Sequence, residues 1–150
     1  MNRTLVIGYG NTLRRDDAAG VYAAELIEKR YPGVECLTAP QLTPEMAVTL
    51  AHYRTVVFID ASTTANELRV TKLRPSAACP EYDSHKMTPQ LLLDASNDLY
   101  GVVPRETIQI EIPARDFTVG ELPSPAVREI VEHCVDEFPR LIYPASAGTV

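Results

Sequence analysis

One segment near the N-terminus, residues 4–20 with the sequence TLVIGYGNTLRRDDAAG, constrains the fold more than any other. Its residues 4–7 are apolar and β-branched, which predicts a buried strand. Two glycines then indicate a loop. Helical periodicity follows over residues 18–30, where apolar side chains recur on one side. This order of strand, loop and helix is typical of a parallel α/β sheet, whose ligands bind at the carboxyl ends of the strands.

The rest of the chain continues the alternation of strands and helices. Strands are predicted at residues 34–38, 55–59, 68–73 and 107–112, and helices at residues 43–52, 88–100 and 124–138. Only about seven residues separate the third and fourth strands, too few for a crossover helix, so we expect these two strands to pair antiparallel. The fold is predicted to be α/β: a three-layer α/β/α sandwich with a mostly parallel five-stranded sheet and one antiparallel strand. Residues 1–143 should form a single domain and residues 144–150 a flexible tail.

Composition excludes several classes of protein. The chain has 150 residues, is 45% hydrophobic, and carries 14 Lys and Arg against 20 Asp and Glu, a net charge of -6. That acidity disfavours nucleic acid as a partner. The apolar stretches, of about five to seven residues, are too short to span a membrane, so we expect a cytoplasmic protein with no membrane partner. We also expect a monomer. Three cysteines, Cys36, Cys79 and Cys134, form no CxxC pair and are interpreted as reduced packing residues.

Three side chains are candidates for a metal site. Asp17 follows the first predicted strand, Asp60 ends the third, and His85 lies ahead of a predicted helix. Because the carboxyl ends of parallel strands share one edge of the sheet, we expect the two aspartates to face the same crevice. An unpaired carboxylate at the end of a central strand is costly unless a cation or donors accompany it. Two oxygens and one nitrogen leave open positions on nickel, zinc or iron.

Other interpretations of these residues remain open. Asp17 and Asp60 could share a proton and activate water as an aspartic-type pair. Asp16 could cap the following helix and interact with its positive end. An acidic pair combined with an aspartate after the third strand is also the pattern of a receiver domain that holds magnesium, although no lysine follows the last strand here. No GxGxxG nucleotide fingerprint and no GxSxG serine elbow is present.

Four segments of the chain resemble the nickel-iron hydrogenase maturation endopeptidases. These segments are IGYGNTLRRDD (residues 7–17), QLTPEMA (41–47), VVFIDAS (56–62) and SHKMTPQLLL (84–93). The QLTPE segment, together with LYG at residues 99–101, is most similar to the branch that processes the bidirectional hydrogenase. The resemblance places the family's metal-contacting residues on Asp17, Asp60 and His85, the same three positions.

The resemblance implies a specific activity. A member of this family removes a short C-terminal peptide from the hydrogenase large-subunit precursor once nickel has been inserted, so the nickel would be supplied by the substrate. Asp17, Asp60 and His85 would then act in catalysis while engaging that metal, and Gln41 and Leu42 are candidates to hold the peptide. The alternatives are a receiver-like module, or a chaperone that binds the precursor without cleaving it.

Overall fold

The computed structural model describes residues 3–76 and 86–143. Its five strands are β1 (Thr4–Tyr9), β2 (Glu35–Ala39), β3 (Thr55–Ser62), β4 (Arg69–Leu73) and β5 (Glu106–Pro113). They form one sheet in the order β2-β1-β3-β5-β4. All neighbouring strands are parallel except β4, which runs antiparallel to β5. The predicted mostly parallel sheet with one antiparallel strand is therefore confirmed.

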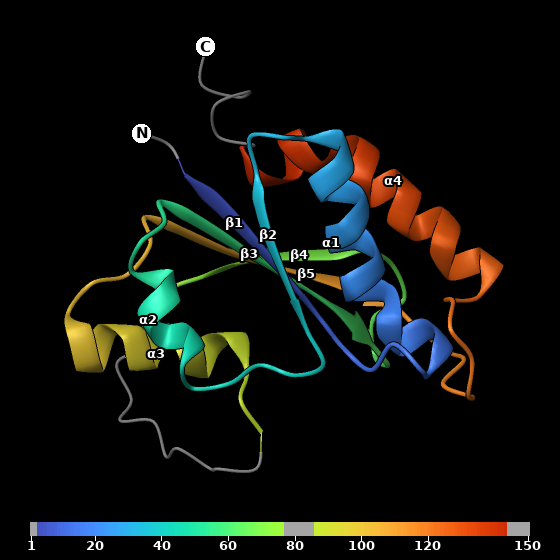
Figure 1. Ribbon diagram of the computed structural model, residues 1–150, viewed down its shortest axis with the longest axis horizontal. Coiled ribbons are helices and arrows are strands. Elements are labelled where there is room, and N and C mark those ends of the chain that lie inside the picture. The colour runs from blue at the N-terminus through green and yellow to red at the C-terminus, as the bar shows by residue number, and fades with distance from the viewer. Residues whose placement is uncertain (1–2, 77–85, 144–150) are drawn as a thin grey trace.

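Helices cover both faces of this sheet (Figure 1). They are the 3-10 helix η1 (Arg15–Ala18) and the α-helices α1 (Ala19–Arg30), α2 (Met46–Leu50), α3 (Pro89–Tyr100) and α4 (Pro125–Ile142). The α1 and α4 helices lie on one face, and α2 and α3 lie on the other. The three-layer arrangement predicted from the sequence is confirmed.

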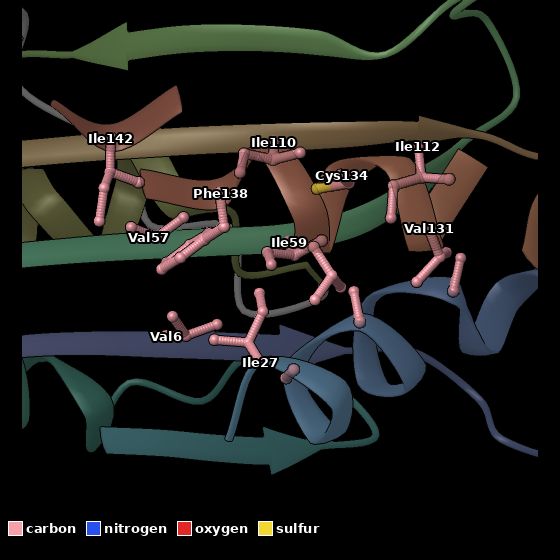
Figure 2. Packing of buried hydrophobic residues seen from close by; sticks show 14 of the residues in the cluster. Val6, Ile27, Val57, Ile59, Ile110, Ile112, Val131, Cys134, Phe138 and Ile142 are labelled. Carbon is pink, nitrogen blue, oxygen red and sulfur yellow. The ribbon is translucent and has the colours of Figure 1, made fainter. Parts of the chain in front are cut away.

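Two apolar clusters hold the layers together. One packs α1 and α4 against alternate residues of the central strands, as Figure 2 shows for Val6, Val57, Ile59 and Ile110 around Phe138. The other packs α2 and α3 against the residues of β1 and β3 that point to the opposite face. Because both faces of β1 and β3 are buried, these strands read as continuous apolar runs, as is usual for parallel sheets.

The prediction that the fourth strand pairs with the third was wrong. We expected it to pair with the third, but β5 lies between them and β4 pairs with β5 alone at the edge of the sheet. The short connection only forbids a parallel pairing with β3; it does not require the two strands to be neighbours. Burial explains the arrangement, because β4, with the sequence RVTKL, is largely exposed, whereas β5 is largely buried.

Two helix boundaries also differ from the prediction. The second helix is shorter than residues 43–52, because its first residues form a turn in which the Met46 amide donates to the Thr43 carbonyl, 3.1 Å away. The last helix does not stop before Pro139 but continues through it. A proline inside a helix leaves the carbonyl four residues earlier without its donor. Here that carbonyl, of Val135, accepts a hydrogen bond of 2.6 Å from the Tyr31 hydroxyl instead.

The start of α1 lies against the ends of β1 and β3 through glycine. A Cβ added to Gly20 would lie 2.1 Å from the Ile59 carbonyl oxygen of β3, and one added to Gly8 of β1 would lie 2.2 Å from the Gly20 carbonyl oxygen. No larger residue fits at either position without moving the backbone. This close approach brings the loop before α1 next to the end of β3, where Asp60 lies.

Candidate active site

A cleft of about 760 Å³ opens at the carboxyl ends of β1 and β3. Its walls come from the end of β1 and the loop that follows, the loop between β2 and α2, the end of β3, the segment before α3, and the C-terminal half of α3. Four of the five predicted site residues line it, namely Asp17, Asp60, Gln41 and Leu42. The fifth, His85, lies outside the described residues. The expectation that the two aspartates face one crevice agrees with this arrangement.

Asp17 reaches the cleft from η1, in the tight loop between β1 and α1. Its carboxylate accepts a hydrogen bond of 2.7 Å from the Asn11 backbone amide, which closes the loop on itself. Gly10 makes this possible, because its φ of +145° and the 1.9 Å between an added Cβ and the Asp17 carbonyl oxygen exclude a side chain. The half-buried Asp17 carboxylate is therefore held in place by its own loop.

Asp60 extends from the end of β3 and is half-buried. Its Oδ2 accepts a hydrogen bond of 2.8 Å from the Tyr9 hydroxyl, and its Oδ1 is buried without a hydrogen-bond partner among the described residues. Burial raises the pKa of Asp60 to about 6, hydrogen bonds from Tyr9 and Gln109 oppose that shift, and the nearby charges of Glu111 and Asp17 add to it. A buried carboxylate that is poorly satisfied by the protein is available to a ligand in the cleft.

Asp16, next to Asp17, has a structural role that the sequence did not reveal. We predicted a helix cap, but no side chain caps η1 or α1. Instead the Asp16 carboxylate, 1% exposed, accepts backbone hydrogen bonds from Arg115 at 3.0 Å, Asp116 at 2.8 Å and Ser124 at 2.7 Å. Burial acts to raise the pKa of Asp16, but these hydrogen bonds outweigh it and hold the pKa below its usual value. Asp16 thus fixes the loop between β5 and α4 to the start of α1.

The two predicted peptide-holding residues differ from one another. Gln41 is exposed on the wall of the cleft and is free to contact a ligand. Leu42 is 5% exposed and belongs to the apolar cluster beneath α2 and α3, so most of its side chain is engaged in packing. Gln41 therefore remains the better candidate for contact with a peptide.

Sequence analysis missed three polar residues of the cleft, Tyr9, Thr43 and Lys86. Tyr9 could have been found from register, because it shares the face of β1 that carries Leu5 and Ile7 and is the last residue of the strand. Lys86 is exposed at the beginning of the segment that leads into α3, directly after His85 in the sequence. Among the described residues that line the cleft, it is the positive charge beside the two aspartates.

The remaining candidate residues that the structure describes lie away from the cleft. The thiols of Cys36 and Cys134 have pKa values raised to about 12 by burial, which agrees with their interpretation as unreactive packing residues. Cys79 is outside the described residues. His52 and His133 are exposed, as a surface role predicts.

The donor set suits a metal only in part. Within residues 3–76 and 86–143, no three His, Cys, Asp or Glu side chains are grouped closely enough to hold an ion. Asp17 and Asp60 supply two carboxylates to one cleft, and the buried Oδ1 of Asp60 lacks a partner within the protein. Such an incomplete set fits a metal whose other ligands come from elsewhere.

The sequence matches no protein-family model, and no curated protein is significantly similar to it. Solved structures are similar. The hydrogenase maturating endopeptidase HybD from E. coli is 21% identical, with a TM-score of 0.67 over 91% of this chain and 89% of that one. HybD from Thermococcus kodakarensis is 22% identical, with a TM-score of 0.66 over 93% and 99%. This chain has the fold of the hydrogenase maturation endopeptidases.

A third structure of this kind supports the same fold. HycI from Thermococcus kodakarensis, described as a [NiFe] hydrogenase maturation protease, is 20% identical and has a TM-score of 0.69 over 94% of this chain and 92% of that one. The endopeptidase fold is therefore shared over nearly the whole domain. It is also the fold of the family that the four sequence segments resemble. In the part of the chain that the structure describes, no helix is both long and apolar enough to cross a membrane.

Proposed function

We propose that this chain is an endopeptidase that removes the C-terminal extension of a nickel-iron hydrogenase large-subunit precursor after nickel insertion. The observation that carries the proposal is one cleft, in the hydrogenase maturation endopeptidase fold, that brings together Asp17 and Asp60 at the carboxyl ends of β1 and β3. The sequence segments that resemble the family contain both aspartates, and both line the cleft although they are 43 residues apart in the chain. The cleft is large enough for several residues of an extended peptide.

Nickel enters this proposal as part of the substrate. Asp17 and Asp60 contribute two oxygen ligands, and His85 is the proposed third ligand, so the remaining ligands come from the precursor. Recognition of the metal then fixes the tail of the precursor beside the two carboxylates and raises the effective concentration of the scissile bond there. Water is activated either by one carboxylate, as in aspartic-type catalysis, or with the assistance of the metal.

The test is the intact mass of the precursor after incubation with this protein. Nickel-loaded and nickel-free precursor are compared in parallel. Loss of a C-terminal fragment from the loaded form alone is the expected result. Rapid cleavage of the nickel-free form would contradict recognition through the metal, and no cleavage of a competent loaded precursor would contradict the activity.

Substitutions distinguish an enzyme from a binding protein. Asp17→Asn and Asp60→Asn should each abolish cleavage while the protein stays folded. Asp136→Asn is the matched control, because Asp136 of α4 is an exposed carboxylate that pairs with Arg30 of α1, and these two helices lie on the opposite face of the sheet from α2 and α3. If the cleft variants cleave as fast as the control, these two carboxylates are not the catalytic pair. A chaperone would bind the precursor and leave its mass unchanged in every case.

We also propose the narrower assignment that the substrate belongs to the bidirectional hydrogenase, and that processing takes place in the cytoplasm with the enzyme as a monomer. The QLTPE segment supports the choice of substrate, because its first residue, Gln41, is exposed on the wall of the cleft. Precursors of different hydrogenase classes, offered in competition at equal concentration, test the substrate. Preference for another class would overturn the narrower assignment and leave the activity intact.

A further inference from the structure

We propose that Tyr9 is a positioning residue that fixes the orientation of the Asp60 carboxylate in the cleft. The inference rests on the proposed function, in which Asp60 acts on the precursor. It adds a residue that sequence analysis did not select, since Tyr9 lies between two glycines whose backbone roles dominate the motif.

The register of the sheet places Tyr9 beside Asp60. In the parallel pair of β1 and β3, Gly8 is opposite Ile59, so Tyr9 and Asp60 occupy the next position along the two strands. Both side chains point to the face that carries α2 and α3, as do Ile7 and Phe58 two residues earlier. The Tyr9 hydroxyl donates to Asp60 Oδ2 over 2.8 Å. The contact thus follows from backbone pairing and is not an incidental approach of two mobile side chains.

The Tyr9 side chain is itself held by packing and cannot easily turn away. It is half-buried and contacts the apolar cluster between the sheet and the helices α2 and α3. A tyrosine hydroxyl keeps its proton at neutral pH, so this group is a donor toward the Asp60 carboxylate. Tyr9 therefore presents a fixed donor to the carboxylate.

Tyr9 donates the hydrogen bond that the Asp60 carboxylate accepts at 2.8 Å, and Gln109 of β5 is a second hydrogen-bonding neighbour. On the opposite side, β5 places Glu111 in register with Asp60, and a second carboxylate repels the first. Arg69, the next residue across the sheet, lies 3.4 Å from Glu111 and so partly neutralises Glu111 without reaching Asp60 directly. With its Oδ1 unpartnered among the described residues, Asp60 is held in one orientation chiefly by Tyr9.

Tyr9→Phe is the test, because it removes the hydroxyl and keeps the ring. Tyr53→Phe is the matched control. The Tyr53 hydroxyl also donates to a carboxylate, that of Glu35, but it lies at the amino ends of the strands, away from the cleft. Kinetics use the intact protein and the nickel-loaded precursor at pH 8. In Tyr9→Phe, kcat should fall about tenfold to a hundredfold, as loss of a hydrogen bond to a charged group implies, while KM changes less than threefold. Tyr53→Phe should retain wild-type kcat.

A second readout does not depend on activity. The ¹³C resonance of the Asp60 side-chain carboxyl, assigned by its absence in Asp60→Asn, should shift in Tyr9→Phe and stay in place in Tyr53→Phe. An unchanged resonance overturns the proposal even if the wild-type protein proves inactive on the precursor. Wild-type kcat in Tyr9→Phe overturns it when the wild-type protein cleaves, and a rise in KM alone would assign Tyr9 to substrate binding instead. Failure of the wild-type protein to cleave counts against the proposed function only.

Discussion

Asp60→Asn should make the folded protein more stable at neutral pH, although it removes a residue of the proposed site. Asp60 is half-buried, and its pKa is raised from 3.8 to about 6, chiefly by burial. Between these two values the folded protein keeps a proton that the unfolded chain has released. The free energy of unfolding therefore falls as the pH rises through this window, and above pH 6 the full penalty for ionising Asp60 remains.

The size of the effect follows from the shift. A difference of roughly two pKa units corresponds to about 3 kcal/mol at about 1.4 kcal/mol per unit, which is an upper value for a group that is only partly buried. Asparagine carries no charge and keeps nearly the same shape. The difference in unfolding free energy between Asp60→Asn and the wild type should thus increase by about 1–3 kcal/mol from pH 4 to pH 7.5.

Urea unfolding at the two pH values, with a chelator present to exclude metal, measures this difference. Comparing the same pair of proteins at both pH values cancels contributions that do not titrate, such as altered packing or the changed contact with Tyr9. A difference that stays constant, or that decreases as the pH rises, would refute the argument that the protein holds Asp60 at an energetic cost. A functional carboxylate is often buried in this way, because the shift in its pKa serves the chemistry of the site even though it lowers the stability of the fold.

Three further predictions concern the scaffold around the site. Asp16→Asn should destabilise the fold by about 2–3 kcal/mol at pH 7, because the new amide NH₂ cannot accept the backbone hydrogen bond that one carboxylate oxygen accepted. The pKa of Asp16 is lowered, so urea unfolding should show this destabilisation shrinking as the pH falls through that pKa, whereas Asp60→Asn should lose a stabilisation over its own pH range. Gly20→Ala should lower the unfolding free energy by about 1–3 kcal/mol, because the added methyl group would collide with the backbone of β3. The control Gly33→Ala, whose added methyl group meets nothing within 4 Å, should leave the unfolding free energy unchanged, and equal stability of the two variants would contradict the close packing at Gly20. Tyr31→Phe should cost about 1 kcal/mol in thermal unfolding, because the Val135 carbonyl loses its donor, and an unchanged midpoint would show that water replaces the hydroxyl.

The expected order of strands and helices was largely confirmed because each element depends on local signals. The third helix shows this most clearly. It runs from Pro89 to Tyr100, its Thr88 side chain accepts the Leu91 amide, and Gly101 ends it with a φ of 64°. The cap and the proline lie at the first residues of the helix and the glycine directly after its last one, so each signal is adjacent to the helix end that it determines. The shared cleft of the two aspartates could also be expected, since the ends of parallel strands meet at one edge.

What the sequence by itself determined is therefore the α/β class, the single antiparallel strand and the common location of Asp17 and Asp60. The tertiary structure alone decided that β4 pairs with β5, that Asp16 holds a distant loop, and that Tyr9 donates to Asp60. The physical reason is the same in each case. A strand edge, a carboxylate or a hydroxyl can be satisfied by many partners, and only the packed chain brings one of them, up to 108 residues away, within hydrogen-bonding distance.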